Sequence, residues 1–373
     1  MSQASQSLIE DHQAEIEQEE RASLPTSLRI SVIVPVRDGS KHLPRCLEAL
    51  GRSEYSQFEV IVVDDCSTDN SPEIAAHYGA RCFRTPQTMG PAGARNLGAQ
   101  YAGGEILLFV DADVVVPPAT LRQVAEDFVR DPELAAVFGS YDDTPAWPTF
   151  ISQYKNLMHH YVHQTSSESA TTFWAGCGAI RRTVFEEFGG FDSATYDKPS
   201  IEDIALGLKL TQSRRRIHLD KRIGVKHLKR WTVRNLLRAD ILYRAIPWTR
   251  LILNTRHLPR DLNLNYASRA SSLLVGLLAL GCLLLPFSLG GLVRPGPVPL
   301  LATMALIGVL LVLLNLDVYR FFLRKRGWWF AVRAVLAHWI YYFYSGVTFF
   351  LMLAMHFIRS PSPSTRDASA QDG

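Results

Sequence analysis

Apolar residues are distributed very unevenly along this chain of 373 residues. Over residues 28–110, short apolar runs of strand length alternate with segments whose apolar residues recur at helical spacing. The last third instead contains three long apolar runs, at 270–293, 298–316 and 335–357. Strand–helix alternation is typical of a parallel α/β sheet, and about 20 apolar residues suffice to cross a bilayer. The pattern predicts an α/β domain followed by a membrane region.

The N-terminal part divides into individual elements. Short runs of β-branched residues predict strands, and proline or glycine at the first turn of the segments between them predicts helices. The run over 106–110 is apolar at every position, as expected for a strand covered on both faces. The predicted strands are 29–36, 58–63, 81–83 and 105–110, and the predicted helices are 42–50, one from Ser71, one from Gly90 and 204–210.

The long apolar runs raise the hydrophobic content to 47% and the mean hydropathy to +0.02, which is high for a soluble enzyme. Buried core helices are the alternative for each run, but three in one third of the chain favour a membrane protein. The first two runs are almost free of charge, whereas the third contains His338 and many aromatic residues and is the least typical span. We therefore expect about three transmembrane helices.

The formal net charge of +3 conceals a strong asymmetry. Residues 1–20 carry six acidic residues and no lysine or arginine, whereas residues 209–260 carry fifteen lysines and arginines against Asp220 and Asp240. A basic block directly before an apolar run favours anionic lipid headgroups over nucleic acid as its partner. Within the block, Thr232 is the predicted N-cap of an amphipathic helix over 233–246 that lies on the cytoplasmic leaflet.

Lysine and arginine also predict the topology. Five of them follow the second apolar run, whereas only Arg294 lies between the first two runs. The positive-inside rule therefore places the loop over 318–334 and the N-terminal domain in the cytoplasm, and the turn over 294–297 and the tail after Arg359 outside. If the third run does not span, only the tail changes side.

We divide the chain into a disordered acidic tail (1–27), an α/β domain (28–231), interfacial helices (232–268), a transmembrane region (269–358) and a second disordered tail (359–373). The N-terminus lacks the apolar segment of a secretory signal, and the five cysteines lack zinc spacing. We therefore expect reduced thiols in the cytosol.

Two carboxylates, Asp111 and Asp113, follow the apolar strand over 106–110. At the carboxyl edge of an open α/β sheet, where ligands bind, such a pair can share a hard divalent cation that grips phosphate oxygens. The alternative is a solvated turn at the end of a strand.

Two further polar constellations accompany this pair. Asp65 follows the second predicted strand, where a carboxylate can accept hydrogen bonds from a ribose or a base, while nearby Asp69 is expected to form a turn. Arg95 lies near the start of a predicted helix. Gly93 in the same turn allows a ligand to approach the backbone closely, and an arginine there can pair with a phosphate group.

The stretches Ser-Val-Ile-Val-Pro-Val-Arg, Val-Val-Asp-Asp-Cys-Ser-Thr-Asp, Gly-x-x-x-Ala-Arg-Asn and Phe-Val-Asp-Ala-Asp occur here in that order. Together they resemble the family-2 glycosyltransferases, which have the GT-A fold, over residues 29–231. The resemblance implies a nucleotide-sugar donor, a divalent metal (Mg²⁺ or Mn²⁺) and inversion at the anomeric carbon. One departure is Arg37-Asp38, where many relatives have Tyr-Asn, so the contact to the base is left open.

The same resemblance implies roles for individual residues. Asp65 recognises the base or ribose, Arg95 helps to fix the nucleotide, and Asp113 is the direct metal ligand with Asp111 beside it. Further nucleotide-sugar contacts are assigned to Pro35, Arg37 and Ala112.

An inverting transfer needs a base for the acceptor hydroxyl. The candidate is Asp203, supported by Glu202, just before the predicted helix over 204–210. Helix N-capping is the alternative role for Asp203. The segment that contains Trp174 and Gly176 lines the acceptor side in the resembling family.

His227, Arg230 and Trp231 resemble the Gln-x-x-Arg-Trp motif of processive polysaccharide synthases, with histidine in place of glutamine. His227 is a candidate metal ligand, Arg230 a candidate contact to the diphosphate, and Trp231 a candidate acceptor contact. The alternative is that Arg230 and Trp231 anchor an interfacial helix in the headgroup zone.

These features predict a multi-pass protein of the inner (cytoplasmic) membrane that transfers a sugar to a lipid or lipid-linked acceptor at the cytoplasmic face. One alternative is a polysaccharide synthase that works with an export or polymerisation partner. Another is a catalytically silent subunit that binds nucleotide sugars. We expect no nucleic-acid partner.

Overall fold

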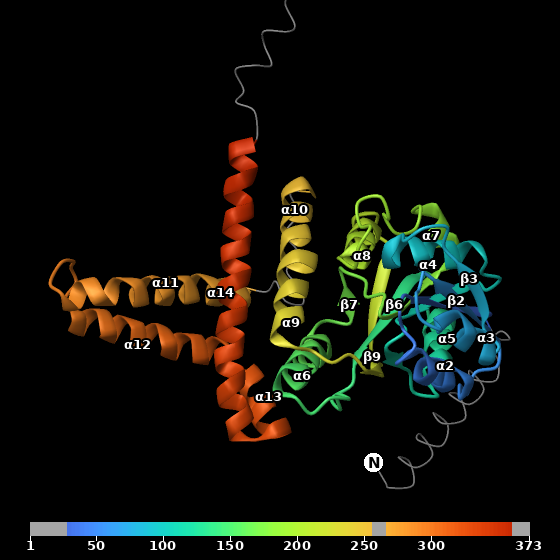
Figure 1. The fold of residues 1–373 in the computed structure, drawn as a ribbon, viewed down its shortest axis with the longest axis horizontal. Coiled ribbons are helices and arrows are strands. Elements are labelled where there is room, and N and C mark those ends of the chain that lie inside the picture. Colours follow the sequence, from blue (N-terminus) through green and yellow to red (C-terminus); the bar gives the residue numbers. More distant parts are fainter. Residues whose placement is uncertain (1–27, 256–265, 360–373) are drawn as a thin grey trace, which may run out of the picture.

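A computed structural model describes residues 28–255 and 266–359. Figure 1 shows an α/β domain on one side and a set of long helices on the other. The domain is built around one sheet of nine strands. In sheet order the strands are β3 (Arg81–Arg84), β2 (Phe58–Asp64), β1 (Ile30–Val36), β4 (Ile106–Val110), β8 (Cys177–Arg181), β6 (Leu134–Tyr141), β9 (Arg216–His227) and β5 (Val114–Val115), and β7 (Ser169–Ala170) pairs with β9.

The sheet is only partly parallel. Strands β3, β2, β1 and β4 are parallel, as the sequence predicts, so their carboxyl ends lie at one edge. Strand β8 enters antiparallel between β4 and β6, and β9 runs parallel to β6. The later strands extend this edge.

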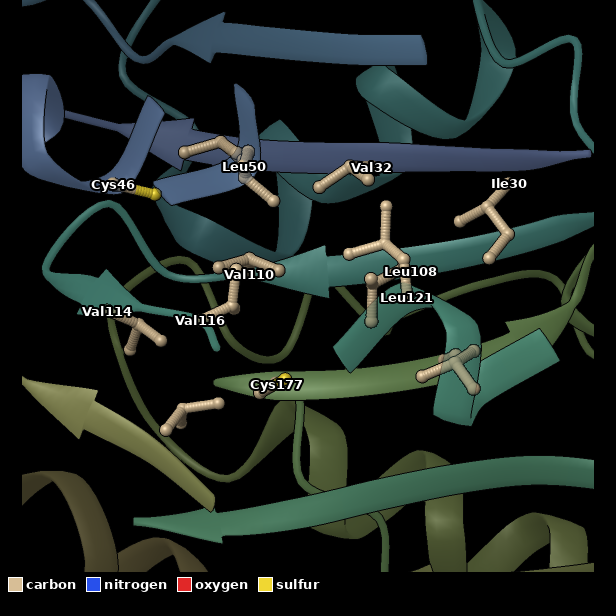
Figure 2. Close-up of a cluster of buried hydrophobic side chains, with 14 of the residues drawn as sticks. Ile30, Val32, Cys46, Leu50, Leu108, Val110, Val114, Val116, Leu121 and Cys177 are labelled. Atoms are coloured by element: carbon tan, nitrogen blue, oxygen red, sulfur yellow. The ribbon is translucent and has the colours of Figure 1, made fainter. Parts of the chain in front are cut away.

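Helices cover both faces of the sheet because side chains alternate along each strand. Val32 and Val34 of β1 belong to one buried cluster, whereas Ile33 belongs to the other. Figure 2 shows the first cluster, in which Leu50 and Leu121 from two helices meet the strands. The helices on this face are α2 (Leu43–Gly51), α3 (Ser71–His77) and α5 (Thr120–Arg130), and those on the other face are α4 (Gly90–Gln100), α7 (Arg182–Glu187) and α8 (Glu202–Gln212).

The boundaries differ from the prediction in two instructive places. Helix α8 begins at Glu202, so the acid pair lies inside its first turn and not before the helix. The loop expected over 318–334 is largely helical. It contains most of α13 (Leu316–Arg326) and the start of α14 (Trp328–Arg359), separated by Gly327 at a positive φ of 80°.

The domain continues into the long helices through α6 (Phe150–Thr165) and the segment after β9. As predicted, Thr232 caps α9 (Val233–Asp240), accepting a hydrogen bond from the Asn235 N–H. The predicted amphipathic helix over 233–246 is longer than expected, because a π-helical turn (Ile241–Ala245) joins α9 to α10 (Ile246–Thr255).

Within residues 28–255 and 266–359, three helices are long and apolar enough to cross a membrane, namely α11 (Tyr266–Leu289), α12 (Pro297–Leu314) and α14. Helices α11 and α12 form a hairpin that points away from the α/β domain, and α14 runs across its base (Figure 1).

Candidate active site

Three polar segments meet where the parallel strands end. Residues 37–38 follow β1, Asp64 ends β2 and Asp65 follows it, and residues 111–113 follow β4. Because β2, β1 and β4 are adjacent and parallel, these ends share one edge of the sheet. Ligands of open α/β sheets bind outside this edge.

His227 ends β9 on the same edge and faces the second acid of the Asp-Ala-Asp motif. It pairs with Val114 of the short strand β5, so its Nε2 lies 3.4 Å from Asp113 Oδ2. The side chains of Asp111 and Asp113 remain 35% and 26% exposed. The two accessible carboxylates supply oxygen ligands of the kind that suits Mg²⁺ or Mn²⁺, and the role of His227 as a further ligand stays a prediction.

Arg95 of α4 connects this edge to α8. One terminal nitrogen donates to Asp111 Oδ1 at 2.7 Å, and the other donates to Glu202 Oε1 at 2.8 Å. The arginine and Glu202 are both buried. Since both terminal nitrogens bind carboxylates, Arg95 positions two acids, and its predicted contact to the nucleotide stays a prediction.

Asp203 lies in the first turn of α8, where its carboxylate accepts hydrogen bonds from the Ala175 N–H at 3.0 Å and the Ile204 N–H at 2.8 Å. The N-cap is Ile201, so Asp203 is not the capping residue, although it does accept the first-turn N–H of Ile204. Burial and the neighbouring Glu202 raise the pKa of Asp203 to about 6. A carboxylate with a pKa closer to neutrality is better matched to general-base catalysis.

Asp65 is buried and makes three hydrogen bonds within the chain. It accepts from Thr85 Oγ1 at 3.0 Å and from the N–H groups of Met89 at 2.7 Å and Gly90 at 2.9 Å. An ionised carboxylate has about four acceptor sites, so about one is left for a ligand. Asp65 therefore fixes the start of α4, and its recognition of a base or ribose stays a prediction.

The turn after β1 presents Arg37 at this edge. The side chain of Arg37 is exposed, while Asp38 adopts a positive φ of 50° and accepts hydrogen bonds from Thr68. Pro35 is half-buried in β1, and Ala112 is half-buried between the two acids. These residues lie at the sheet edge where the nucleotide is predicted to bind.

Residues 31–189 match the family described as glycosyl transferase family 2. The glycosyltransferase GlyG of Streptococcus pneumoniae is 33% identical over 117 residues, which are 30% of this chain and 38% of GlyG. The poly(ribitol-phosphate) β-N-acetylglucosaminyltransferase TarS of Staphylococcus aureus is 34% identical over 105 residues, 26% of this chain and 18% of TarS.

The chain therefore spans less than half the length of these two relatives. Among solved structures, the mannosyltransferase PcManGT of Pyrobaculum calidifontis, in complex with GDP-Man and Mn²⁺, aligns with a TM-score of 0.48. The identity is 17%, and the alignment covers 90% of this chain and 89% of that one.

Aromatic rings lie beside these polar groups at the sheet edge. The Trp174 ring stands edge-on to Tyr141 at 5.0 Å, and Tyr141 stacks on the His227 ring at 4.3 Å. Gly176 is required beside it, because an added Cβ would lie 2.5 Å from the Trp174 ring. Tyr141 was missed by the sequence reasoning, since it lies in no motif, although it ends β6 at the same edge.

Trp231 and Arg230 do not both face the site at the sheet edge. Trp231 is only 6% exposed, and its backbone N–H donates to Ser152 Oγ of α6 at 2.9 Å. Arg230 is exposed, with its guanidinium 5.2 Å from the centre of the Trp147 ring. The burial of Trp231 disfavours both an open acceptor platform and a headgroup anchor for this residue, whereas the roles of the exposed Arg230 stay predictions.

A second group of possible metal ligands does not include Asp111 or Asp113. Asp127 of α5 and His218 and Asp220 of β9 have ligand atoms within 4.8 Å of one another. However, the Arg222 guanidinium already binds both carboxylates at 2.8 Å. Burial and Asp220 raise the pKa of Asp127 to about 7. Arg222 therefore compensates part of this charge, and Asp127 Oδ2 stays buried without a hydrogen-bond partner.

Proposed function

We propose that the protein is a metal-dependent, inverting glycosyltransferase of the inner membrane. It moves a sugar from a nucleotide diphosphate to a lipid or lipid-linked acceptor at the cytoplasmic face. The proposal is finer than the family, because family-2 relatives such as TarS are named for acceptors that differ from a membrane lipid.

The observation that carries the proposal is the Arg95 bridge. It joins Asp111, beside the predicted metal, to Glu202, which precedes the predicted base Asp203. The donor diphosphate and the acceptor hydroxyl must be held at a fixed separation for an in-line displacement, and misplacement by about 1 Å can cost 10²-fold in rate. A buried arginine between the two acids holds that separation.

The chemistry divides among the residues at this edge. Asp113, Asp111 and His227 would hold a divalent cation, which neutralises charge on the departing diphosphate. Asp203 accepts the proton of the acceptor hydroxyl as its oxygen attacks the anomeric carbon. The Ala175 N–H orients the carboxylate of Asp203, and Trp174 covers the site from the side.

A membrane acceptor is supported by the contacts of α8. Its N-cap Ile201 and its residue Ala205 pack with Trp248 and Leu251 of α10. Ser200 also donates a hydrogen bond to the Tyr243 carbonyl at 3.2 Å. The helix of the predicted base therefore rests on the amphipathic segment, which would lie at the headgroups.

The decisive experiment is an assay in lipid nanodiscs with a panel of nucleotide sugars and total membrane lipid, with products identified by mass spectrometry. We expect one sugar added to a lipid, in the presence of Mn²⁺ or Mg²⁺ and not after chelation. A product with many sugar units would replace this proposal with the polysaccharide synthase. Absence of nucleotide diphosphate release with every donor would indicate the silent subunit.

A further inference from the structure

Helix α14 does not run in the direction of the other two apolar helices. In Figure 1, α11 and α12 extend away from the glycosyltransferase domain, whereas α14 lies across their base and alongside α10. Contacts of α14 with α10, α11 and α13 confirm this position. If the hairpin crosses a bilayer along its own length, α14 lies along the membrane surface.

The middle of α14 is tied to a charged cluster of the catalytic domain. Tyr344, midway between Trp328 and Arg359, donates a hydrogen bond to Asp240 at 2.7 Å. Asp240 is buried and also binds Lys155 of α6 at 2.7 Å and Arg244 at 3.2 Å. A spanning α14 would place this cluster at the bilayer centre, where each charge costs several kcal/mol.

Neither half of α14 provides an alternative span. The first half packs on the catalytic domain, because Ala334 is buried with Tyr154 of α6 and Phe322 of α13. The second half, residues 345–359, extends only about 22 Å at 1.5 Å per residue. That is shorter than a hydrocarbon core of about 30 Å.

The composition of α14 fits a helix that lies in the interface. Its mean hydropathy is 1.3, against 2.3 for α11 and 2.5 for α12. Ala334, His338 and Tyr342 are buried on its packed side. Exposed apolar residues recur every three or four positions on another face, at Val332, Leu336, Ile340, Phe343, Val347 and Leu351.

Basic and aromatic groups gather where α14 begins. Trp328 and Trp329 are exposed. Arg326 and Arg333 line a groove of about 400 Å³ between α6 and the start of α14, and the Arg333 guanidinium lies 4.1 Å from the Phe150 ring centre. Tryptophan and arginine at a helix end suit the headgroup zone, and the positive charge suits anionic lipids.

We propose that α14 lies in the membrane plane, with its exposed apolar face in a bilayer surface that carries anionic headgroups. Only α11 and α12 cross, so the chain after Arg359 is on the same side as the catalytic domain. The inference rests on the membrane attachment of the proposed function. It makes α14, with α9 and α10, the surface that holds the catalytic domain against its acceptor.

The side of the C-terminus tests this directly in the full-length chain, expressed in a bacterial inner membrane. Reporters that are active on one side only are placed before Met1, after Gly291 and after Gly373. We expect the two terminal reporters on the cytoplasmic side and the Gly291 reporter on the other. A C-terminal reporter on the Gly291 side would overturn the inference while leaving sugar transfer, assayed separately, intact. Release of the protein by alkaline wash would overturn it together with membrane attachment.

Depth measurements provide the matched control within one molecule. Single nitroxide labels at Leu336, Ile340, Val347 and Leu351 are compared with labels at Leu273, Leu277, Leu280 and Leu283 of α11, in liposomes with anionic lipid and in a chain without its native cysteines. We expect one shallow depth of about 5–10 Å along α14. Along α11, depth should change by about 15 Å.

A change of about 22 Å along the α14 labels would show that the helix spans and would overturn the inference. Labels shielded from both lipid-soluble oxygen and aqueous relaxation agents would identify a second copy of the chain as the occupant, which also overturns it. Retained sugar transfer by each labelled protein confirms that it is folded.

Discussion

The polar sheet edge of the α/β domain and the three apolar helices could both be predicted from the sequence, but to different degrees. At the sheet edge, strand pairing converts sequence order into position, so Asp65, Asp111 and Asp113 had to lie together. In the helical region, hydropathy located α11, α12 and α14 but contained no information on their directions. A β-strand is placed by its hydrogen-bonded neighbours, whereas a helix satisfies its own backbone and is placed by side-chain packing alone.

The comparison predicts that one substitution at the sheet edge strongly lowers the rate of sugar transfer without affecting membrane attachment. Asp203→Asn should lower the rate of sugar transfer by about 10²–10⁴-fold, because the acceptor hydroxyl loses its base. Nucleotide binding, measured by calorimetry, and sedimentation with membranes should stay unchanged. Asp131→Asn, on the far side of the sheet, is the control. Full turnover by Asp203→Asn would assign the base elsewhere.

A second substitution tests whether the geometry of the sheet edge depends on the Arg95 bridge. Arg95→Lys replaces a planar guanidinium that binds both Asp111 and Glu202 with one point charge, so either Asp111 or the buried Glu202 loses its partner. The free energy of unfolding should fall by about 3 kcal/mol, and metal affinity by about 10–100-fold.

Arg181→Lys is the matched control for Arg95→Lys, because Arg181 donates only to backbone carbonyls. It should lower stability without changing the Mn²⁺ concentration needed for half-maximal transfer. If both variants shifted this concentration equally, the Arg95 bridge would be structural only.

The pH dependence sharpens the same point. Asp203 must be ionised to act, and its pKa is about 6, so transfer should fall about tenfold per pH unit below 6. A raised carboxyl pKa stabilises the folded state at low pH, and this contribution is lost as pH rises through about 6. Asp203→Asn should therefore gain up to about 3 kcal/mol of stability at pH 8, and progressively less towards pH 4. Equal effects at both values, measured by denaturant unfolding, would contradict the raised pKa.

The smallest effect is expected in the helical region. Tyr344→Phe removes one of three partners of Asp240, so stability should fall by about 1–2 kcal/mol. The rate of sugar transfer in detergent should fall by orders of magnitude less in Tyr344→Phe than in Asp203→Asn. Tyr78→Phe, at an exposed position of the domain, is the control for the loss of a hydroxyl. If Tyr344→Phe lowered the rate of sugar transfer as much as Asp203→Asn, the helical region would be part of the catalytic site, and the comparison between the two regions would fail.

Residue order alone determined the alternation of strands and helices, the acids at the strand ends and the three apolar helices, because these depend on local periodicity. Tertiary structure decided what each side chain does. Trp231 is buried against α6, Arg95 binds two acids, and Asp65 holds the start of α4, since these contacts join segments far apart in sequence. The direction of α14 was decided in the same way, by the Asp240 cluster that binds its middle.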